Sequence, residues 1–330
     1  MNPRKLIKQN EKGAVLLTTL LVMSIMATVA VNVMDDVRFA LKRTANVQAY
    51  TQADWYINGA EDFAQNYLQS LIGRLDPSVL NTALLQAEPV ILPIEGGAIT
   101  LRARDGGDCL SLSDIENAAG RRLFRQLLEA TGWDTLSAAN FTSVAADWVD
   151  SDSQALPGGA EDFVYLGRTP AYRTSNSSFT AVSELRALSG MDEDKFQALR
   201  PYVCARDDAA TAINIDAINI TQAPVLAAVL GGAQQLTLAQ SLINARPPEG
   251  YQSLETLNAS PLLSEAQIDA EAAALIAFSP RYIWVEIDVS YLNITRHAVI
   301  EFSNNDGNLS PVFRRLSKDE ARPTVLESET

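Results

Sequence analysis

The stretch DWVDSDSQALPGGAEDF, residues 147–163, places carboxylate and amide side chains on both sides of a Pro-Gly-Gly turn. Calcium in proteins is held by about six to eight oxygen ligands, often from a bendable loop rich in Asp and Glu. The stretch therefore predicts a calcium site. The carboxylates expected to ligate the ion are Asp150, Asp152, Glu161 and Asp162, with Gln154 as a further oxygen donor.

The spacing of these residues matches an EF-hand loop only in part. With Asp150 as position one, oxygen side chains fall at positions three, five and twelve. An EF-hand needs Gly at position six, where this chain has Ala155, and Pro157 follows. The stretch is therefore not an EF-hand. Two interpretations remain open, a calcium loop of another kind and an acidic loop that only meets water.

Catalytic chemistry has little support in the sequence. It has no glycine-rich phosphate loop, no G-x-S-x-G and no H-E-x-x-H motif. The one histidine, His297, falls in an expected strand and is interpreted as a sheet residue. The two cysteines, Cys109 and Cys204, follow a membrane-directed segment, so we expect them to pair in an oxidising compartment. Two buried free thiols are the alternative. The sequence thus predicts that the protein is not an enzyme.

A nucleic-acid partner is also excluded by charge. The sequence patterns of segments 183–199, 213–232 and 253–270 resemble helix-hairpin-helix units. Such units need basic residues to meet phosphate. Here the turn of the first carries residues 192–194, which are all acidic, and the whole chain has a net charge of -14. We interpret these segments as helices packed in an interaction domain.

An uncharged run of 21 residues extends from Ala14 to Met34, and it is expected to anchor the part of the protein that carries the acidic stretch. About 20 apolar residues span a bilayer as a helix. The basic leader before the run and Asp35 and Asp36 after it predict a single pass with a cytoplasmic N-terminus. A secretory signal cut after Ala30 is the alternative.

The apolar pattern continues beyond this run. Apolar residues recur at helical spacing at Val37, Leu41, Ala45, Ala49, Tyr56, Ala60, Phe63, Tyr67 and Leu71. No Gly or Pro lies between Ala14 and Asn58, and Gly73 and Pro77 provide stop signals. The membrane helix is therefore expected to continue as an amphipathic stem, which a disposable signal has no reason to do.

Strand patterns flank a helical block, which predicts an α+β fold. The expected strands are residues 90–94, 98–104, 281–289, 295–302 and 311–316. The expected helices between them are residues 113–131, 138–149, 181–188, 193–202, 224–230, 236–245 and 264–277. We expect a long N-terminal helix packed on an antiparallel sheet, with a large all-helical domain inserted between strands.

A short basic leader ending in Gly13, then an apolar helix that runs on into a globular domain, resembles the type IV prepilin-like proteins. In that family a prepilin peptidase cuts after the glycine, which would leave Ala14 as an N-methylated terminus. Members usually carry Glu at the fifth mature position, where this chain has Thr18. An uncharged fifth residue and large size resemble the K-type minor pseudopilins of the type II secretion system.

The resemblance implies the domain plan, the location and the partners. The expected divisions are residues 1–13 (cleaved leader), 14–34 (membrane helix), 35–108 (stem and first strands), 109–279 (inserted helical domain), 280–317 (last strands) and 318–330 (flexible tail). It implies a Gram-negative inner membrane, a periplasmic globular domain and calcium in the acidic loops of the helical domain. The implied partners are the I-type and J-type minor pseudopilins, with the H type as a further candidate, bound through the helix and stem.

Thr18 and the size of the insertion together predict a place at the tip of the pseudopilus. The family's Glu neutralises the charged N-terminus of the subunit ahead, and an unpaired carboxylate in an apolar bundle is costly. A subunit with nothing ahead of it needs no such Glu. The expected function is therefore a tip subunit that supports export of folded proteins. The alternative is a membrane-anchored periplasmic binding or enzymatic domain unrelated to filaments.

Overall fold

The structure, a computed structural model, describes residues 4–206, 212–263, 268–305 and 307–316, with side chains from residue 13 onward. The expected flexible tail, 318–330, and residues 264–267 at the start of an expected helix lie outside this part of the chain.

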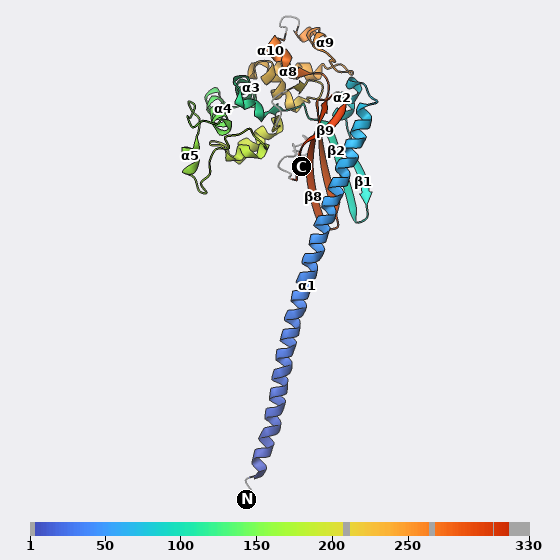
Figure 1. The fold of residues 1–330 in the computed structure, drawn as a ribbon, viewed down its shortest axis with the longest axis vertical. Helices are drawn as coiled ribbons and strands as arrows, with labels where there is room; N and C mark the ends of the chain where they lie inside the picture. Colours follow the sequence, from blue (N-terminus) through green and yellow to red (C-terminus); the bar gives the residue numbers. More distant parts are fainter. Residues whose placement is uncertain (1–3, 207–211, 264–267, 306, 317–330) are drawn as a thin grey trace.

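Helix α1 (Arg4–Ile72) is one uninterrupted rod of 69 residues, and the rest of the molecule sits at its C-terminal end (Figure 1). Its segment from Gly13 is the one described helix long and apolar enough to cross a membrane. The C-terminal part of α1, the stem, buries one face. This face is formed by Ala49, Ala53, Ile57, Ala60, Ala64 and Leu68. These recur every three or four residues, and the alanines let the helix approach the sheet closely.

A five-stranded antiparallel sheet in the order β1-β2-β7-β8-β9 packs on this face of α1. Its strands are β1 (Val90–Ile94), β2 (Gly97–Asp105), β7 (Tyr282–Tyr291), β8 (Ile294–Asn305) and β9 (Asn308–Arg315). Alternate residues of the strands point to α1, among them Ile283, Val285 and Ile287 of β7. Helix α2 (Pro77–Leu85), which the sequence patterns did not predict, packs against β2. This unit is the pilin-like half of the protein.

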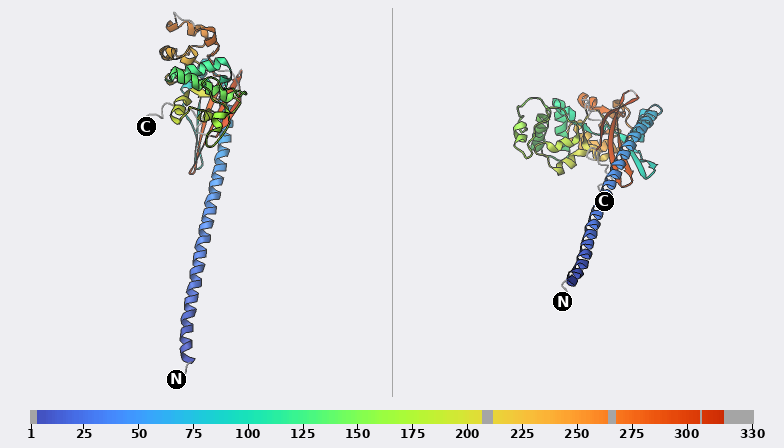
Figure 2. Two further views of the ribbon diagram at one scale, coloured as in Figure 1. Left: turned by 90° about the vertical axis from the view of Figure 1, so that its left-hand side faces the viewer. Right: turned by 60° about the horizontal axis from the view of Figure 1, so that its bottom comes forward.

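Between β2 and β7 the chain builds an inserted domain with its own apolar core, which spreads sideways from the sheet (Figures 1 and 2). Its α-helices are α3 (Ala118–Ala130), α4 (Thr135–Val149), α5 (Asp162–Leu166), α6 (Glu193–Leu199), α7 (Ala223–Val229), α8 (Leu236–Asn244), α9 (Leu254–Asn258) and α10 (Ala270–Ala274). Its 3-10 helices are η1 (Leu112–Glu116), η2 (Val182–Ala187), η3 (Arg200–Tyr202), η4 (Ile220–Gln222), η5 (Ala233–Gln235) and η6 (Pro261–Leu263).

Two parallel pairs of two-residue strands accompany these helices. They are β3 (Leu110–Ser111) with β4 (Val203–Cys204), and β5 (Ile213–Asn214) with β6 (Ile276–Ala277). The fold class is thus the expected one, a long helix on an antiparallel sheet with a helical insertion. The insertion also contains these short ladders.

Several expected helices differ in extent. The helix expected over residues 113–131 is broken at Asn117, where η1 ends and α3 begins. The one expected over 181–188 is the 3-10 helix η2. Of the one expected over 264–277, the described part forms only α10 and strand β6. Helical periodicity alone did not register the caps that end these segments.

Candidate functional site

Helix α4 supplies one wall of the acidic site. It begins after Asp134, whose carboxylate accepts a hydrogen bond from the Ser137 backbone N–H at 3.0 Å. This is the usual N-cap interaction and fixes the start of the helix. The helix ends at Asp150, its C-cap residue, and Asp147 in its last turn is fully buried. Asp147 and Asp150 are three residues apart, which places their carboxylates on one side of the helix end.

The Pro-Gly-Gly turn lies directly on α4. The Leu156 backbone N–H donates to both carboxylate oxygens of Asp147, at 3.1 and 3.2 Å. A Cβ atom at Gly159 would lie 2.0 Å from Oδ2 of Asp147, and one at Gly158 would lie 2.2 Å from Oδ1 of Asn140. The close approach of the loop to the buried Asp147 side chain therefore favours glycine at 159. Gly158 has a φ of +80°, a left-handed conformation that favours glycine.

Glu161 completes the cluster from the far side of the loop, at the start of α5. One ligand atom from each of Asp147, Asp150 and Glu161 lies within 4.8 Å of the other two. Glu161 is 2% exposed, and its Oε1 and the Oδ1 of Asp150 are buried without a hydrogen-bond partner among the residues described. Unpaired buried carboxylate oxygens are costly, so this arrangement fits a bound cation.

The electrostatics agree with the geometry. Burial raises the pKa of all three carboxyl groups above its usual value. Repulsion from neighbouring carboxylates adds to the rise, chiefly from Asp152 on Asp150 and from Asp147 on Glu161. The protein without a cation thus disfavours the charge that these groups carry at neutral pH. A divalent cation would relieve that cost.

The structure brings together two of the four ligands expected from the sequence, Asp150 and Glu161. Asp152 is exposed, and its Oδ1 accepts from the Gln154 backbone N–H at 2.8 Å. Asp162 accepts from the backbone N–H and hydroxyl of Thr174, at 3.0 and 2.9 Å. The Thr174 backbone hydrogen bond is the main cause that lowers the pKa of Asp162. Asp162 therefore stabilises the loop around Thr174.

Asp147, which the structure places in this cluster, was not among the ligands expected from the sequence. It falls in the helix expected over residues 138–149, just before the loop. The signal that could have found it is its position three residues before Asp150, at the end of that helix.

A second buried site joins the inserted domain to the pilin-like half. Cys109 and Cys204 form a disulfide with their Cα atoms 5.8 Å apart, next to the β3–β4 ladder. Two residues later, the guanidinium of Arg206 reaches Glu301 of β8 with hydrogen bonds of 2.7 to 3.1 Å. Their side chains are 1% and 0% exposed. Arg206 also lies over the ring of Tyr282 in β7, at 4.1 Å from its centroid.

The residues expected to govern processing lie on α1. Gly13 and Ala14 are exposed, and a Cβ atom at Gly13 would meet nothing within 4 Å. The fold therefore gives no steric reason for glycine there. Thr18 is exposed, and its hydroxyl donates to the Val15 carbonyl at 2.9 Å. This bond within the helix satisfies the hydroxyl in an apolar surrounding.

A 69-residue helix whose apolar segment from Ala14 to Met34 is exposed, and whose later part packs on an antiparallel sheet, fits a pilin-like protein with a single-pass membrane anchor. Family models for "Type II secretion system (T2SS), protein K" match residues 108–208 and 213–279, both in the inserted domain. The chain belongs to the type II secretion system protein K family.

Comparison with individual proteins supports the same family assignment. The chain is 33% identical to the type II secretion system protein K of Klebsiella pneumoniae, over 84% of this chain and 88% of that one. It is 30% identical to that of Pectobacterium carotovorum, over 86% and 89%. A chain in the crystal structure of the GspK-GspI-GspJ complex from enterotoxigenic Escherichia coli matches with a TM-score of 0.69 and 23% identity, over 84% of this chain and 99% of that chain. This last likeness shows the shared fold.

These findings confirm the resemblance to K-type minor pseudopilins of the type II secretion system. A membrane-anchored domain unrelated to filament assembly is not favoured. The family is that of a structural component.

Proposed function

We propose that this minor pseudopilin forms the tip of the periplasmic pseudopilus and supports export of folded proteins across the outer membrane. The observation that carries this proposal is the shape of the molecule. The inserted domain extends sideways at the end of the rod remote from the N-terminus (Figures 1 and 2). A body of that width should clash with a subunit stacked above it.

The proposed partners are the I-type and J-type minor pseudopilins, with the H type as a further candidate. They would pack alongside and below through α1. Its exposed apolar residues include Phe39, Leu41, Val47 and Trp55, the last 66% exposed. The likeness to a chain of the GspK-GspI-GspJ complex supports this choice.

Two matched substitutions test the tip position. Thr18→Glu and Thr19→Glu both place a carboxylate in the same apolar segment, one residue apart. At the tip neither charge finds a partner, so both should weaken complex formation about equally. In a laterally placed subunit Thr18→Glu would meet the N-terminus of the subunit ahead and be tolerated, while Thr19→Glu would not. That split, or cross-links from a pseudopilin above the inserted domain, would refute the tip assignment.

We further propose that a prepilin peptidase cuts after Gly13 and leaves an N-methylated Ala14. The chain would cross the inner membrane of a Gram-negative bacterium once, with its N-terminus cytoplasmic before processing and its globular part periplasmic. Mass spectrometry of the mature protein should find Ala14 first. Because the space around Gly13 is open, Gly13→Val should block cleavage without unfolding the protein. A chain that starts at Met1 or Val31 would contradict the proposal.

The carboxylates of Asp147, Asp150 and Glu161 are proposed to hold calcium. The buried, unpaired oxygens of Asp150 and Glu161 support this choice over a merely solvated loop. The ion would tie α4 to α5 and neutralise the cluster. Asp147→Asn and Glu161→Gln should abolish calcium binding measured by calorimetry, whereas Asp162→Asn, which removes a carboxylate bonded to Thr174, should retain it. Equal binding by all three variants would count against the cluster.

A further inference from the structure

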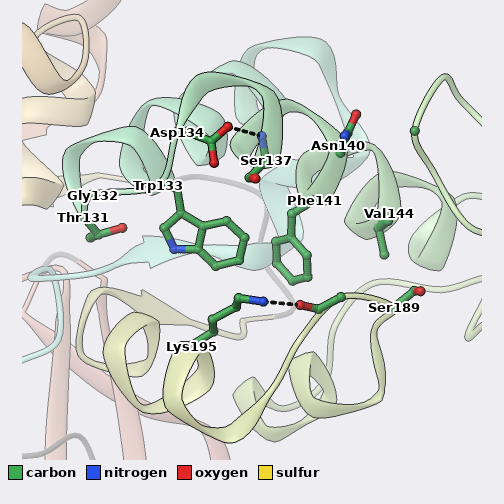
Figure 3. Close-up of a pocket in the computed structure, with 12 residues that line it drawn as sticks. Thr131, Gly132, Trp133, Asp134, Ser137, Asn140, Phe141, Val144, Ser189 and Lys195 are labelled. Carbon is green, nitrogen blue, oxygen red and sulfur yellow. Dashed lines mark hydrogen bonds between the residues drawn. The ribbon is translucent and has the colours of Figure 1, made fainter.

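A groove of about 630 Å³ runs along α4 (Figure 3). The acidic cluster lies at the C-terminal end of the same helix. Trp133, Phe141 and Val144 form its apolar floor, and the rings of Trp133 and Phe141 lie 5.2 Å apart. Ser137 and Asn140 line one rim, and the segment from Ser189 to Lys195 contributes the other. The volume falls within the range of about 300–1,000 Å³ that is usual for ligand sites.

The groove and the acidic cluster share one face of α4. Ser137, Asn140, Phe141 and Val144 follow helical spacing along the groove, and Asp147 continues the same stripe one turn on. The turn at 156–159 lies along this stripe, with Gly158 against Asn140 and Gly159 against Asp147. Gly158 is also one of the residues that line the groove. One loop therefore closes both sites.

We propose that this groove binds an extended peptide segment from an exported protein, and that a cation at the carboxylate cluster holds the groove in its binding shape. The proposal rests on the function proposed above and adds to it a site and a class of ligand.

The lining favours a peptide with one apolar side chain. Aromatic rings accept an aromatic or aliphatic side chain on their faces, and Ser137, Asn140 and Ser189 offer hydrogen bonds to a peptide backbone. At Gly132 and Gly190, which also line the groove, an added Cβ would meet nothing within 4 Å, so the backbone is uncovered on that side.

Charge favours a neutral or basic segment. The ammonium group of Lys195 already pairs with Asp192 at 2.9 Å and donates to the Gly190 carbonyl at 3.0 Å. Asp134 then remains as an acidic group of the groove, although it also caps α4. A ligand with an acidic group would be repelled there.

An exported protein is a better occupant than another pseudopilin because of position. Helices α4 and α5 lie at the end of the inserted domain farthest from α1 (Figure 1). Subunits that assemble through α1 pack at the opposite side of the molecule. The groove therefore stays open in a filament joined through the stem.

The cation acts through the loop. Asp147 and Asp150 belong to the end of α4, and Glu161 belongs to the start of α5 beyond the turn. A cation bound by all three draws α5 and the turn onto α4, which sets Gly158 in place at the groove. Without it, the like charges oppose this closure. Cation and peptide binding are therefore coupled.

The binding experiment uses the mature full chain in detergent, labelled with 5-fluorotryptophan. The fluorine resonance of Trp133 is assigned with Trp133→Phe. The probe is the acetylated and amidated peptide Gly-Phe-Gly-Arg, with Gly-Ala-Gly-Arg as its control. In calcium the Phe peptide should shift the Trp133 resonance saturably. In chelator, or in Glu161→Gln, its affinity should be about tenfold lower, within the usual range of coupling.

A matched pair of variants locates the site. Ser137→Phe fills the groove, whereas Leu136→Phe places the same ring on the neighbouring residue, which is 70% exposed and does not line the groove. Only Ser137→Phe should abolish peptide binding and lower export. Equal peptide affinity in calcium and chelator would overturn the coupling. Tighter binding of an N-acetylglucosamine tetramer than of the peptide would overturn the ligand class.

Assembly is measured in the same cells by cross-linking through α1. If Ser137→Phe assembles and exports normally, the proposed role of the groove in export is refuted, but the proposed tip function is not. Normal export without any assembly would instead refute the proposed tip function.

Discussion

The pilin-like half and the inserted domain each have an apolar core, but they are held together differently. The pilin-like half joins a 69-residue helix to a sheet whose longest strand, β8, has 12 residues. The inserted domain has no described α-helix longer than α4, with 15 residues, and several have only five. Helices below about 12–15 residues are marginal alone. The inserted domain therefore depends on contacts between distant segments.

Three such contacts stand out, the disulfide, the buried ion pair at the junction, and the acidic cluster. Each joins residues far apart in sequence or across a loop. If the comparison is right, breaking them should harm the inserted domain far more than surface changes do.

The disulfide should contribute most. It closes a loop of 95 residues, which in the chain-entropy account stabilises by about 4–5 kcal/mol. Cys109→Ser with Cys204→Ser should lower the free energy of urea unfolding by an amount of this order. Hydrogen exchange should show α3 and α4 losing protection before β7 and β8. Ready alkylation of both thiols in the folded, unreduced protein would exclude the bond.

The ion pair at the junction comes next. Arg206→Met leaves Glu301 buried without its partner, which typically costs about 3–5 kcal/mol. Replacing both residues, by Met and Leu, should cost less than the single change because no charge remains buried. The matched control is Arg122→Ala, which breaks an ion pair with Glu271 whose side chains are 41% and 59% exposed. That change should cost at most about 1 kcal/mol. Equal losses for Arg206→Met and Arg122→Ala would contradict the comparison.

The two halves also differ in how far the sequence predicts them. The alternation of residues 281–289 correctly predicted a strand, and the apolar spacing after Met34 correctly predicted a continuous helix. Both follow from local periodicity. That periodicity does not say which polar residue of a strand is buried. In the structure Glu301 is fully buried, because Arg206 reaches it from 95 residues away. No local pattern encodes that pairing.

The acidic site was predictable to the same limited extent. The loop was found from its composition, and Asp150 and Glu161 do meet in the cluster. Asp147 was missed and Asp162 was included, because their roles depend on the path of the turn over α4 and on Thr174. Sequence spacing within a loop does not fix that path.

Calcium should stabilise the protein in a pH-dependent way. At a calcium concentration of a hundred times Kd the gain is about 2.7 kcal/mol. Without calcium, the raised pKa values of Asp147, Asp150 and Glu161 mean that their stabilising contribution is present below the ordinary carboxyl range and lost as pH rises through the raised values. Calcium cancels this loss.

The difference in melting temperature between calcium and chelator should therefore grow from about pH 4, the ordinary carboxyl range, toward neutral pH. Thermal scans at several pH values measure it, with Asp147→Asn as the variant that should flatten the profile and Asp162→Asn as the control that should not. A difference independent of pH would mean that calcium acts elsewhere.

The smallest expected effect concerns Asn117. The sequence predicts one helix over residues 113–131, whereas the structure breaks it at Asn117. In the structure the Asn117 side chain accepts from the Gly120 backbone N–H at 2.8 Å and caps α3. Asn117→Ala should then destabilise by about 1 kcal/mol. In an unbroken helix the same change should stabilise, because Ala has the higher helix propensity.

The stability of Gly120→Ala is a second test of whether the helix is broken at Asn117. A Cβ atom at Gly120 would lie 1.8 Å from the backbone oxygen of Asp114, so the variant should be destabilised. In an unbroken helix it should gain up to about 1 kcal/mol. Arg125→Ala, at an exposed position of α3, should stay within about 0.5 kcal/mol of the parent in the same urea titration. Asn117→Ala and Gly120→Ala should both lower the free energy of unfolding if this part of the inserted domain follows its caps and tertiary contacts. Both should raise it if the segment follows its local periodicity.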